Sequence, residues 1–227
     1  MKKYYQPTLC AAVMVLAAST AQADNDNRKF ALGIGAGTTG YSISGTFNLS
    51  KTTNIRAIYA SYDDTLNETS SGIDYVYDLD LSTTSLLLDW HPFKGSFRLS
   101  IGAVNNGNEY RATASQNTGS ITVGNQTFST AQLGTLRAEV DTDSVAPYLG
   151  IGWGNAVSNK GGALSFSADI GVIFQGDPTV TLTTEGTDAA IQSQVTTQLA
   201  IEKEQLEDDL NDFKFYPVIN LGLGYRF

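Results

Sequence analysis

The 227-residue chain has one cysteine, one histidine and few basic residues, and each scarcity excludes a class of protein. A single cysteine cannot build a disulfide scaffold or a zinc site of cysteines. Fourteen lysines and arginines against 23 acidic residues give a net charge of −9, so the composition offers no basic surface for nucleic acid. With 41% hydrophobic residues, the composition is also not that of a disordered chain.

The chain also lacks an apolar run of the roughly 20 residues that a transmembrane helix needs. Near its start, a positively charged segment precedes the apolar run from Leu9 to Ala18, and Ala21-Gln22-Ala23 has the small-residue pattern that signal peptidase cleaves. The sequence therefore predicts a signal peptide over 1–23 and a mature protein over 24–227. We expect this protein in the periplasm, in the outer membrane or outside the cell.

What the chain has in abundance is alternation of apolar with small or polar residues, which predicts β-strands with one apolar face. In the last segment, every odd position from Phe215 to Phe227 is apolar, while the even positions include Asn220, Gly222 and Gly224. We expect eight such strands, over residues 30–37, 41–49, 54–62, 73–81, 97–104, 145–153, 164–174 and 215–227.

The strand over 73–81 indicates what surrounds these faces, because its apolar residues alternate with Asp74, Asp78 and Asp80. Aspartates at alternate positions are unfavourable around a dry core but suit a strand between lipid and a hydrated interior. An even number of strands can close into a barrel that leaves no unpaired backbone edge in lipid. The sequence therefore predicts an all-β, eight-stranded antiparallel transmembrane β-barrel.

The alternation is imperfect in two places, and in one of them, the segment 54–62, either phase fits equally well. Leu86, Leu87, Leu88 and Trp90 are out of phase with 73–81, so we expect a β-bulge near Ser82–Ser85.

Connection lengths set the orientation of the predicted barrel. With both termini in the periplasm, the periplasmic turns are short and the connections 63–72, 108–143 and 175–213 form long external loops. Trp90 and Trp153 then lie at the periplasmic rim and Tyr75 and Tyr77 toward the external rim, as an aromatic girdle requires.

The last external connection predicts one amphipathic helix, within 187–213. Its apolar positions recur at steps of three, four or seven, and acidic residues occupy the rest of its circumference. We expect the apolar stripe to pack on the barrel rim or on a neighbouring loop; a partner-facing or lipid-facing element is the alternative.

Two patterns suggest chemistry that their context does not support. The glycine motif from Gly35 to Gly40 matches a dinucleotide-binding fingerprint, but a predicted strand follows it instead of the required helix. His91 precedes Pro92 in a short turn, away from the outer leaflet where a catalytic base would meet lipid. With one histidine, we expect no catalytic residue, no cofactor and no metal site.

The inward positions of the predicted strands carry opposite charges. Arg56, Arg98 and Arg226 fall in the periplasmic half, Asp169 lies near the middle, and Asp74, Asp78 and Asp80 fall in the external half. We expect a lumen charge network of Arg56, Arg98, Asp169 and Arg226, because unpaired charges there would lose solvation. The alternative is an ion-selective path, for which inward glycines leave some room.

Four parts of the chain resemble the small outer-membrane β-barrel proteins of Gram-negative bacteria. They are the segments 88–100, 146–155, 169–176 and the closing stretch Tyr216–Phe227. The resemblance implies an eight-stranded barrel in the outer membrane. It also implies that the closing strand, with Tyr225 and Phe227, is the signal for the outer-membrane assembly machinery.

We therefore expect an integral, monomeric outer-membrane protein with a structural or surface-binding role through its external loops. Its expected partners are outer-membrane lipid, lipopolysaccharide and the assembly machinery, with no nucleic acid. The first alternative is a narrow channel for small or hydrophobic solutes. The second is a lipid-modifying enzyme, which the histidine count disfavours.

Overall fold

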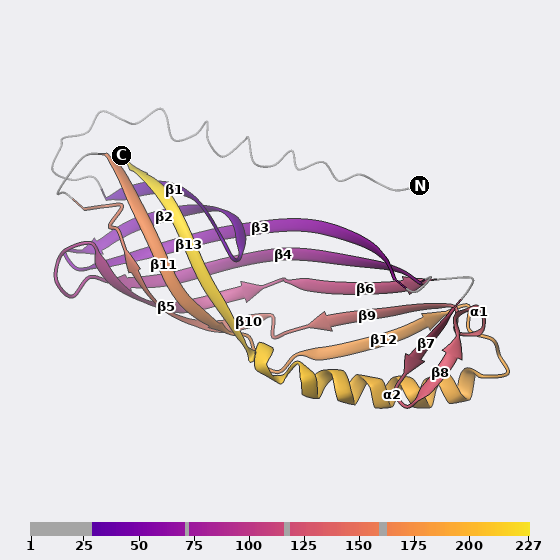
Figure 1. Cartoon of the computed structure of the whole chain (residues 1–227). Coiled ribbons are helices and arrows are strands. Elements are labelled where there is room, and N and C mark those ends of the chain that lie inside the picture. Colours follow the sequence, from indigo (N-terminus) through magenta and orange to yellow (C-terminus); the bar gives the residue numbers. More distant parts are fainter. Residues whose placement is uncertain (1–28, 71–72, 116–118, 159–162) are drawn as a thin grey trace.

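The computed structural model describes residues 29–70, 73–115, 119–158 and 163–227. The predicted signal peptide, 1–23, lies outside the described residues. Eight strands form a closed antiparallel ring, which we call the barrel (Figure 1). They are β1 (Phe30–Gly37), β2 (Gly40–Ser50), β3 (Thr53–Ser70), β4 (Ile73–Trp90), β5 (Phe97–Asn106), β10 (Val145–Trp153), β11 (Leu164–Phe174) and β13 (Phe215–Arg226).

The ring closes because its first and last strands pair. Strand β1 pairs with β13 from Ala31↔Arg226 to Gly37↔Asn220, and β4 pairs with β5 from Thr83↔Asn106 to Trp90↔Leu99. Each of the eight predicted segments overlaps one strand of this ring. The described part of the chain has 13 strands, and the five outside the ring are not among the predicted segments.

Alternation of side chains places the apolar residues on the outside of the barrel. In β10, Val145 and Leu149 are 64% and 55% exposed, whereas Ala146 and Tyr148 between them are buried. Successive strand residues point to opposite faces, so each strand presents one face to the lumen and one to the surroundings. The same pattern exposes Tyr41, Phe47 and Leu49 on β2.

The long connections, for which the sequence predicted no strands, are largely folded. Strands β3 and β4 have 18 residues each and continue beyond the ring. Beyond β4, the same sheet adds β6 (Glu109–Ser115), β9 (Thr135–Asp141) and β12 (Thr179–Glu185). We call this part of the molecule the extension (Figure 1). The prediction failed because these short strands lack the lipid-facing apolar alternation that identified the others.

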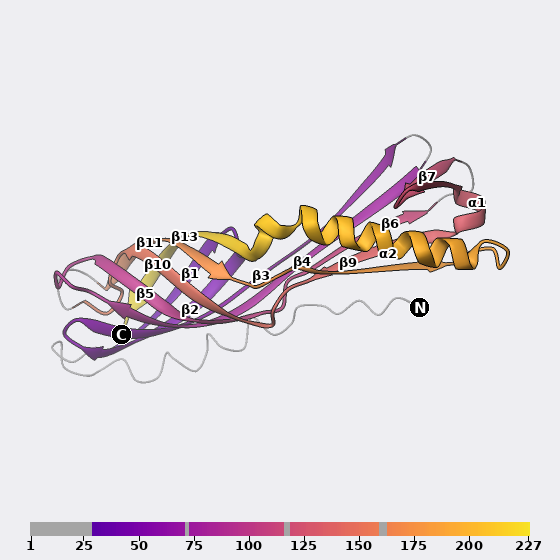
Figure 2. The ribbon, with the colours of Figure 1, turned by 90° about the horizontal axis from the view of Figure 1, so that it is seen from below.

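The extension is completed by a hairpin and helices. The hairpin comprises β7 (Ser120–Val123) and β8 (Gln126–Ser129), and α1 (Thr130–Leu133) follows it. The long helix α2 (Gln192–Asp209) runs along the extension beside β12, and a short 3-10 helix, η1 (Asn211–Lys214), leads back to β13 (Figure 2). None of the helices in the described ranges is both long and apolar enough to cross a membrane.

Helix α2 uses the apolar stripe that the sequence predicts, but its bounds are narrower than 187–213. Val195 of α2 is fully buried with Val123, Phe128 and Leu133 of the hairpin segment, and Leu199 packs against them. The stripe therefore covers a neighbouring connection and β12, which contacts α2, instead of the rim of the barrel.

Strand β4 has no bulge against β3, which corrects an expectation from the sequence. The pairing runs without a shift from Thr53↔Trp90 to Ser70↔Ile73. The odd residues of β4 therefore stay on the inner face throughout, from buried Asp89 in the barrel to buried Leu81 and Ile73 in the extension. The apolar residues of β4 change from odd to even positions along the strand, while its pairing with β3 stays the same. This change of polarity is what suggested a bulge.

Candidate functional site

The lumen of the barrel holds a buried cluster of two arginines and two aspartates. Arg56 on β3 donates from Nε to Asp89 Oδ2 at 2.8 Å and from Nη1 to Asp169 Oδ2 at 3.0 Å. Its Nη2 donates to the second oxygen of each carboxylate, at 3.1 Å in both cases. One guanidinium thus bridges two carboxylates on opposite walls, a geometry that suits the planar arginine fork.

Arg98 on β5 completes this cluster. Its Nη2 donates to Asp169 Oδ1 at 2.7 Å, and its Nη1 donates to the carbonyl of Gly154. Ser100 Oγ donates to Asp89 Oδ1 at 2.6 Å. All four charged side chains are at most 8% exposed, and their two positive and two negative charges balance. This balance is what makes burial of four charges tolerable.

Three of the four predicted network residues, Arg56, Arg98 and Asp169, come together in this cluster. Arg226 does not join it: the residue is 7% exposed, and its Nε and Nη1 have no hydrogen-bond partner in the described ranges. Sequence reasoning missed Asp89, although it alternates with the outward residues Leu86, Leu88 and Trp90, a pattern that places it on the inner face.

The end of the lumen near the short turns is closed by polar side chains around His91. Its Nδ1 lies 3.0 Å from the carbonyl oxygen of Gly95 and 3.1 Å from that of Phe97, so Nδ1 carries the proton. Its Nε2 then accepts from Asn54 Nδ2 at 3.1 Å. Asn54 also donates to Asn155 Oδ1 at 3.2 Å. Both ring nitrogens of His91 are therefore engaged in holding the turns together.

The other half of the lumen is filled by apolar side chains. Leu87, Val104, Ala146, Tyr148, Ile173 and Val218 form one buried group above the charged cluster. Small cavities lie beside it, among them one of about 40 Å³ and one of about 30 Å³, and both of these touch Ser42, Arg56 and Asn220. Each has room for about one to three water molecules. The interior is thus a packed core, as the diameter of an eight-stranded barrel allows.

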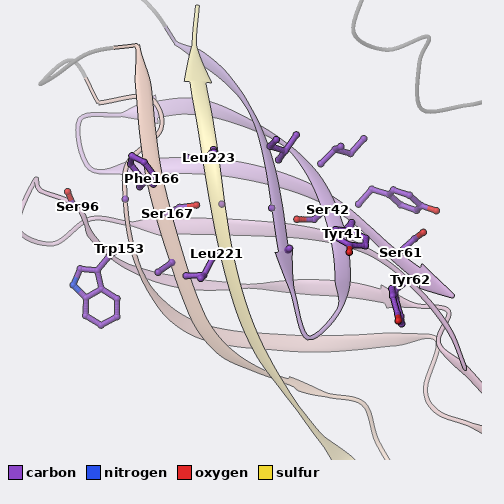
Figure 3. A pocket seen from close by; sticks show the side chains of 18 of the residues that line it. Tyr41, Ser42, Ser61, Tyr62, Ser96, Trp153, Phe166, Ser167, Leu221 and Leu223 are labelled. Atoms are coloured by element: carbon purple, nitrogen blue, oxygen red, sulfur yellow. The ribbon is translucent and has the colours of Figure 1, made fainter. Parts of the chain in front are cut away.

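The large hollow in the structure lies on the barrel wall around β1 and has a volume of about 1230 Å³ (Figure 3). Tyr41 and Tyr62 lie on one side of it, and Trp153 and Phe166 lie on the other, with β13 between (Figure 3). Its lining is mainly the outward apolar face, where small residues such as Ala36 make the wall shallow. This hollow is part of the apolar outer surface and does not enter the lumen's charged cluster.

The predicted aromatic girdle divides between two locations. Trp90 and Trp153 are 50% and 47% exposed on the outside of the barrel, at the end of the short turns. Tyr75 and Tyr77 instead share the inner face of the extension with Ile73 and Leu81, and their rings stack with centroids 6.1 Å apart. They therefore do not form the external half of a girdle.

Charged residues cover the outer face of the extension, where the sequence had placed lumen aspartates. Asp78 lies opposite Arg111, and Asp80 opposite Glu109, on this face. Arg111 Nε in turn donates to Glu139 Oε1 at 3.3 Å. In the described segments, no group of three or more histidine, cysteine or acidic side chains is arranged to hold a metal ion.

Comparisons with known proteins and solved structures give information on the fold. No family model matches the chain, and no curated protein matches it. Among solved structures, CarO2 of Acinetobacter baumannii matches with a TM-score of 0.58 and 18% identity, over 88% of this chain and 98% of that chain. CarO of the same species matches with a TM-score of 0.55 and 20% identity, over 90% and 100%.

A major outer membrane protein from Thermus thermophilus matches more weakly, with a TM-score of 0.41 and 15% identity, over 88% of this chain and 98% of that chain. The two stronger likenesses, taken with the closed ring, show that the chain has the fold of an outer-membrane β-barrel.

Proposed function

We propose that the protein is an integral outer-membrane β-barrel that binds partners at the cell surface through its extension. The apolar belt around the barrel supports a lipid environment, because soluble proteins rarely expose so continuous an apolar surface. The predicted signal peptide supports export, and the short turns at one end support a periplasmic position for that end.

The observation that carries the surface-binding role is the contrast between a filled lumen and a large folded extension. The four-charge cluster and the apolar group above it occupy the interior. The extension adds three strands, a hairpin and α2 beyond the barrel. Connections that only joined barrel strands would not need this much buried structure, so we assign the binding role to the extension.

A non-enzymatic role is part of this proposal. His91 is the only histidine in the sequence, and both of its ring nitrogens are engaged by Asn54 and by backbone carbonyls. A general base needs a free nitrogen within reach of substrate. Lipid A mass spectrometry after expression tests this point, and a new modification would contradict it.

The proposed partners around the barrel are outer-membrane lipid and lipopolysaccharide, with the protein as a monomer. We also retain Tyr225 and Phe227 as the assembly signal. Their rings meet edge to face with centroids 5.2 Å apart, and Tyr225 is 51% exposed.

Cysteine labelling in intact cells tests the orientation. The predicted mature chain lacks cysteine, so single cysteines can be introduced at exposed Asn125 in the hairpin turn and at exposed Lys51 in a short turn. A membrane-impermeant maleimide should label Asn125→Cys in intact cells and Lys51→Cys only after permeabilisation. Labelling of both or of neither in intact cells would contradict the proposal.

Conductance separates this function from the narrow channel, which the two small cavities beside the cluster favour. Refolded protein in planar bilayers should show no steady conductance, because the lumen is packed. A stable unitary conductance that Asp169→Ala alters would favour the channel and contradict the surface-binding proposal.

A further inference from the structure

Within the described residues, several stretches of strand in the large sheet have no neighbour on one side, and among them are three at or next to the extension. They are β12, the first residues of β13, and residues 62–70 of β3, which continue past the end of β2 at Tyr41↔Ser61. Unpaired strand edges invite pairing with another chain, so proteins usually block them.

Side chains cap two of these three edges. On β12, the Val180 N–H donates to Glu207 Oε1 at 2.9 Å, and Lys203 Nζ donates to the Val180 carbonyl at 2.7 Å. On β13, the Thr38 hydroxyl donates to the Pro217 carbonyl at 2.9 Å and accepts from the Ile219 N–H at 3.1 Å. The fold therefore blocks edges where their backbone would be open.

The third edge has no such cap. Residues 62–70 are all exposed, and among the described residues no side chain from another element bonds to their backbone. The one side-chain bond to the backbone here is local: the Thr65 N–H donates to Asp64 Oδ1 at 2.9 Å. This nine-residue stretch, which we call the β3 edge, is longer than a typical five- to six-residue strand.

The charges of the β3 edge argue against a second copy as its partner. Asp64, Leu66 and Glu68 share the inner face of the strand. Antiparallel pairing of two copies centred on Leu66 would place Asp64 of one copy opposite Glu68 of the other. Like charges in directly opposed positions destabilise a strand pair.

We propose that the β3 edge binds an extended basic segment of a partner protein as an added strand. The partner strand would carry lysine or arginine opposite Asp64 and Glu68, with an apolar residue between them opposite Leu66. Leu66 is 63% exposed and lies beside Tyr77, which is 41% exposed. The apolar residue of the partner strand would therefore extend a row of apolar side chains that runs across β4 and β3. Backbone hydrogen bonds would supply affinity and the alternating side chains specificity, as in other strand additions.

This inference rests on the proposed function, since the β3 edge belongs to the extension. The same acidic residues could serve only to block aggregation, and the experiment separates the two roles.

The test uses the full chain refolded in detergent and hydrogen exchange read by mass spectrometry. The probe is a seven-residue peptide in which threonines alternate with lysine, valine and lysine; its partner peptide has glutamates in place of the lysines. The basic peptide should protect the amides of 62–70, and the acidic one should not. The variant Asp64→Asn/Glu68→Gln should bind the basic peptide about 2- to 30-fold more weakly.

A matched control removes the same charge elsewhere: Asp208→Asn/Asp209→Asn on exposed positions of α2 should bind like the parent. No binding, or binding without protection of 62–70, would overturn strand addition. If the amides of 62–70 became protected without peptide as the protein concentration rises, the partner of the β3 edge would be a second copy of the chain, and the proposal would be wrong. The outcome of this experiment does not affect the labelling and conductance tests. Strand addition and the proposed function can therefore be disproved independently.

Discussion

The barrel and the extension share two continuous strands, and along one of them, β4, the polar residues change from the inner to the outer face. In the barrel part of β4, Asp89 faces the lumen and Leu88 faces outward at 43% exposure. In the extension part of the same strand, Leu81 faces inward and Asp80 faces outward. The register does not shift between them.

This inversion shows what determines polarity in the fold. A face that meets lipid must be apolar, and the interior behind it can hold charges if they are paired. A face that meets water can be charged, and the interior behind it is then stabilised by apolar burial. The change occurs near Ser82 to Thr84, which we assign to the membrane boundary.

The largest expected effect is in the lumen of the barrel. Asp169→Ala should leave Arg56 and Arg98 without a shared carboxylate and lower the free energy of unfolding by about 3–5 kcal/mol. Urea unfolding of refolded protein measures it. Asp78→Ala on the outer face of the extension is the control and should change stability by less than about 0.5 kcal/mol. Equal effects would remove the distinction between the two regions.

Double mutants test which side chains belong to the charged cluster. Asp169→Ala combined with Arg98→Ala should be non-additive by about 0.5–3 kcal/mol, because the two side chains are in contact. The combination with Arg226→Ala should be additive, since Arg226 lies outside the cluster. Additivity with Arg98 and with Arg56 would contradict the geometry described for Asp169.

The next effect compares two positions on one face of β4. Leu86→Arg puts a charge in the apolar belt and should cost about 2–4 kcal/mol if Leu86 lies near the bilayer centre. Val76→Arg, on the same face but in the extension, should cost less than about 0.5 kcal/mol. Unfolding in lipid vesicles measures both. A similar loss of stability at the two sites would show that the membrane boundary does not lie between Val76 and Leu86.

A smaller effect concerns the capped edge of β12. Hydrogen bonds from Lys203 and from the Val180 N–H lower the pKa of Glu207 below its usual value. The cap is therefore complete at neutral pH and is lost as pH falls through this lowered pKa. Glu207→Ala, which removes the acceptor, should speed hydrogen exchange at Val180 at neutral pH, without affecting the barrel. Unchanged exchange would show that α2 protects this edge without the cap.

The smallest expected effect on stability lies at the closing strand. Phe227→Asp should cost only about 0–1 kcal/mol, because the residue is near the membrane interface. Its level in the outer membrane should nevertheless fall, since we expect the assembly machinery to recognise Phe227. Normal levels by fractionation would contradict that role.

The ring could be predicted from the sequence because lipid imposes a strict two-residue period on each strand that crosses it. The extension could not, because in water short strands tolerate polar residues on both faces. Asp89 was missed for a different reason: alternation with Leu88 and Trp90 places it inside, but it lies beyond the segment 73–81 that was predicted as the strand. The prediction that Arg226 joins the charged cluster failed for another reason. Alternation shows which face a side chain lies on, but not which side chain it pairs with.

The inversion of polarity along β4 can be measured directly by a spin-label scan of its residues from Asp74 to Trp90 in lipid bilayers. Labels at Leu86 and Leu88 should be accessible to oxygen, and labels at Asp74, Asp78 and Asp80 to a water-soluble nickel complex. Labels at the buried odd positions Leu81, Leu87 and Asp89 should be protected from both reagents. A switch of the protected positions from odd to even near Ser82 would contradict the continuous register on which the account depends.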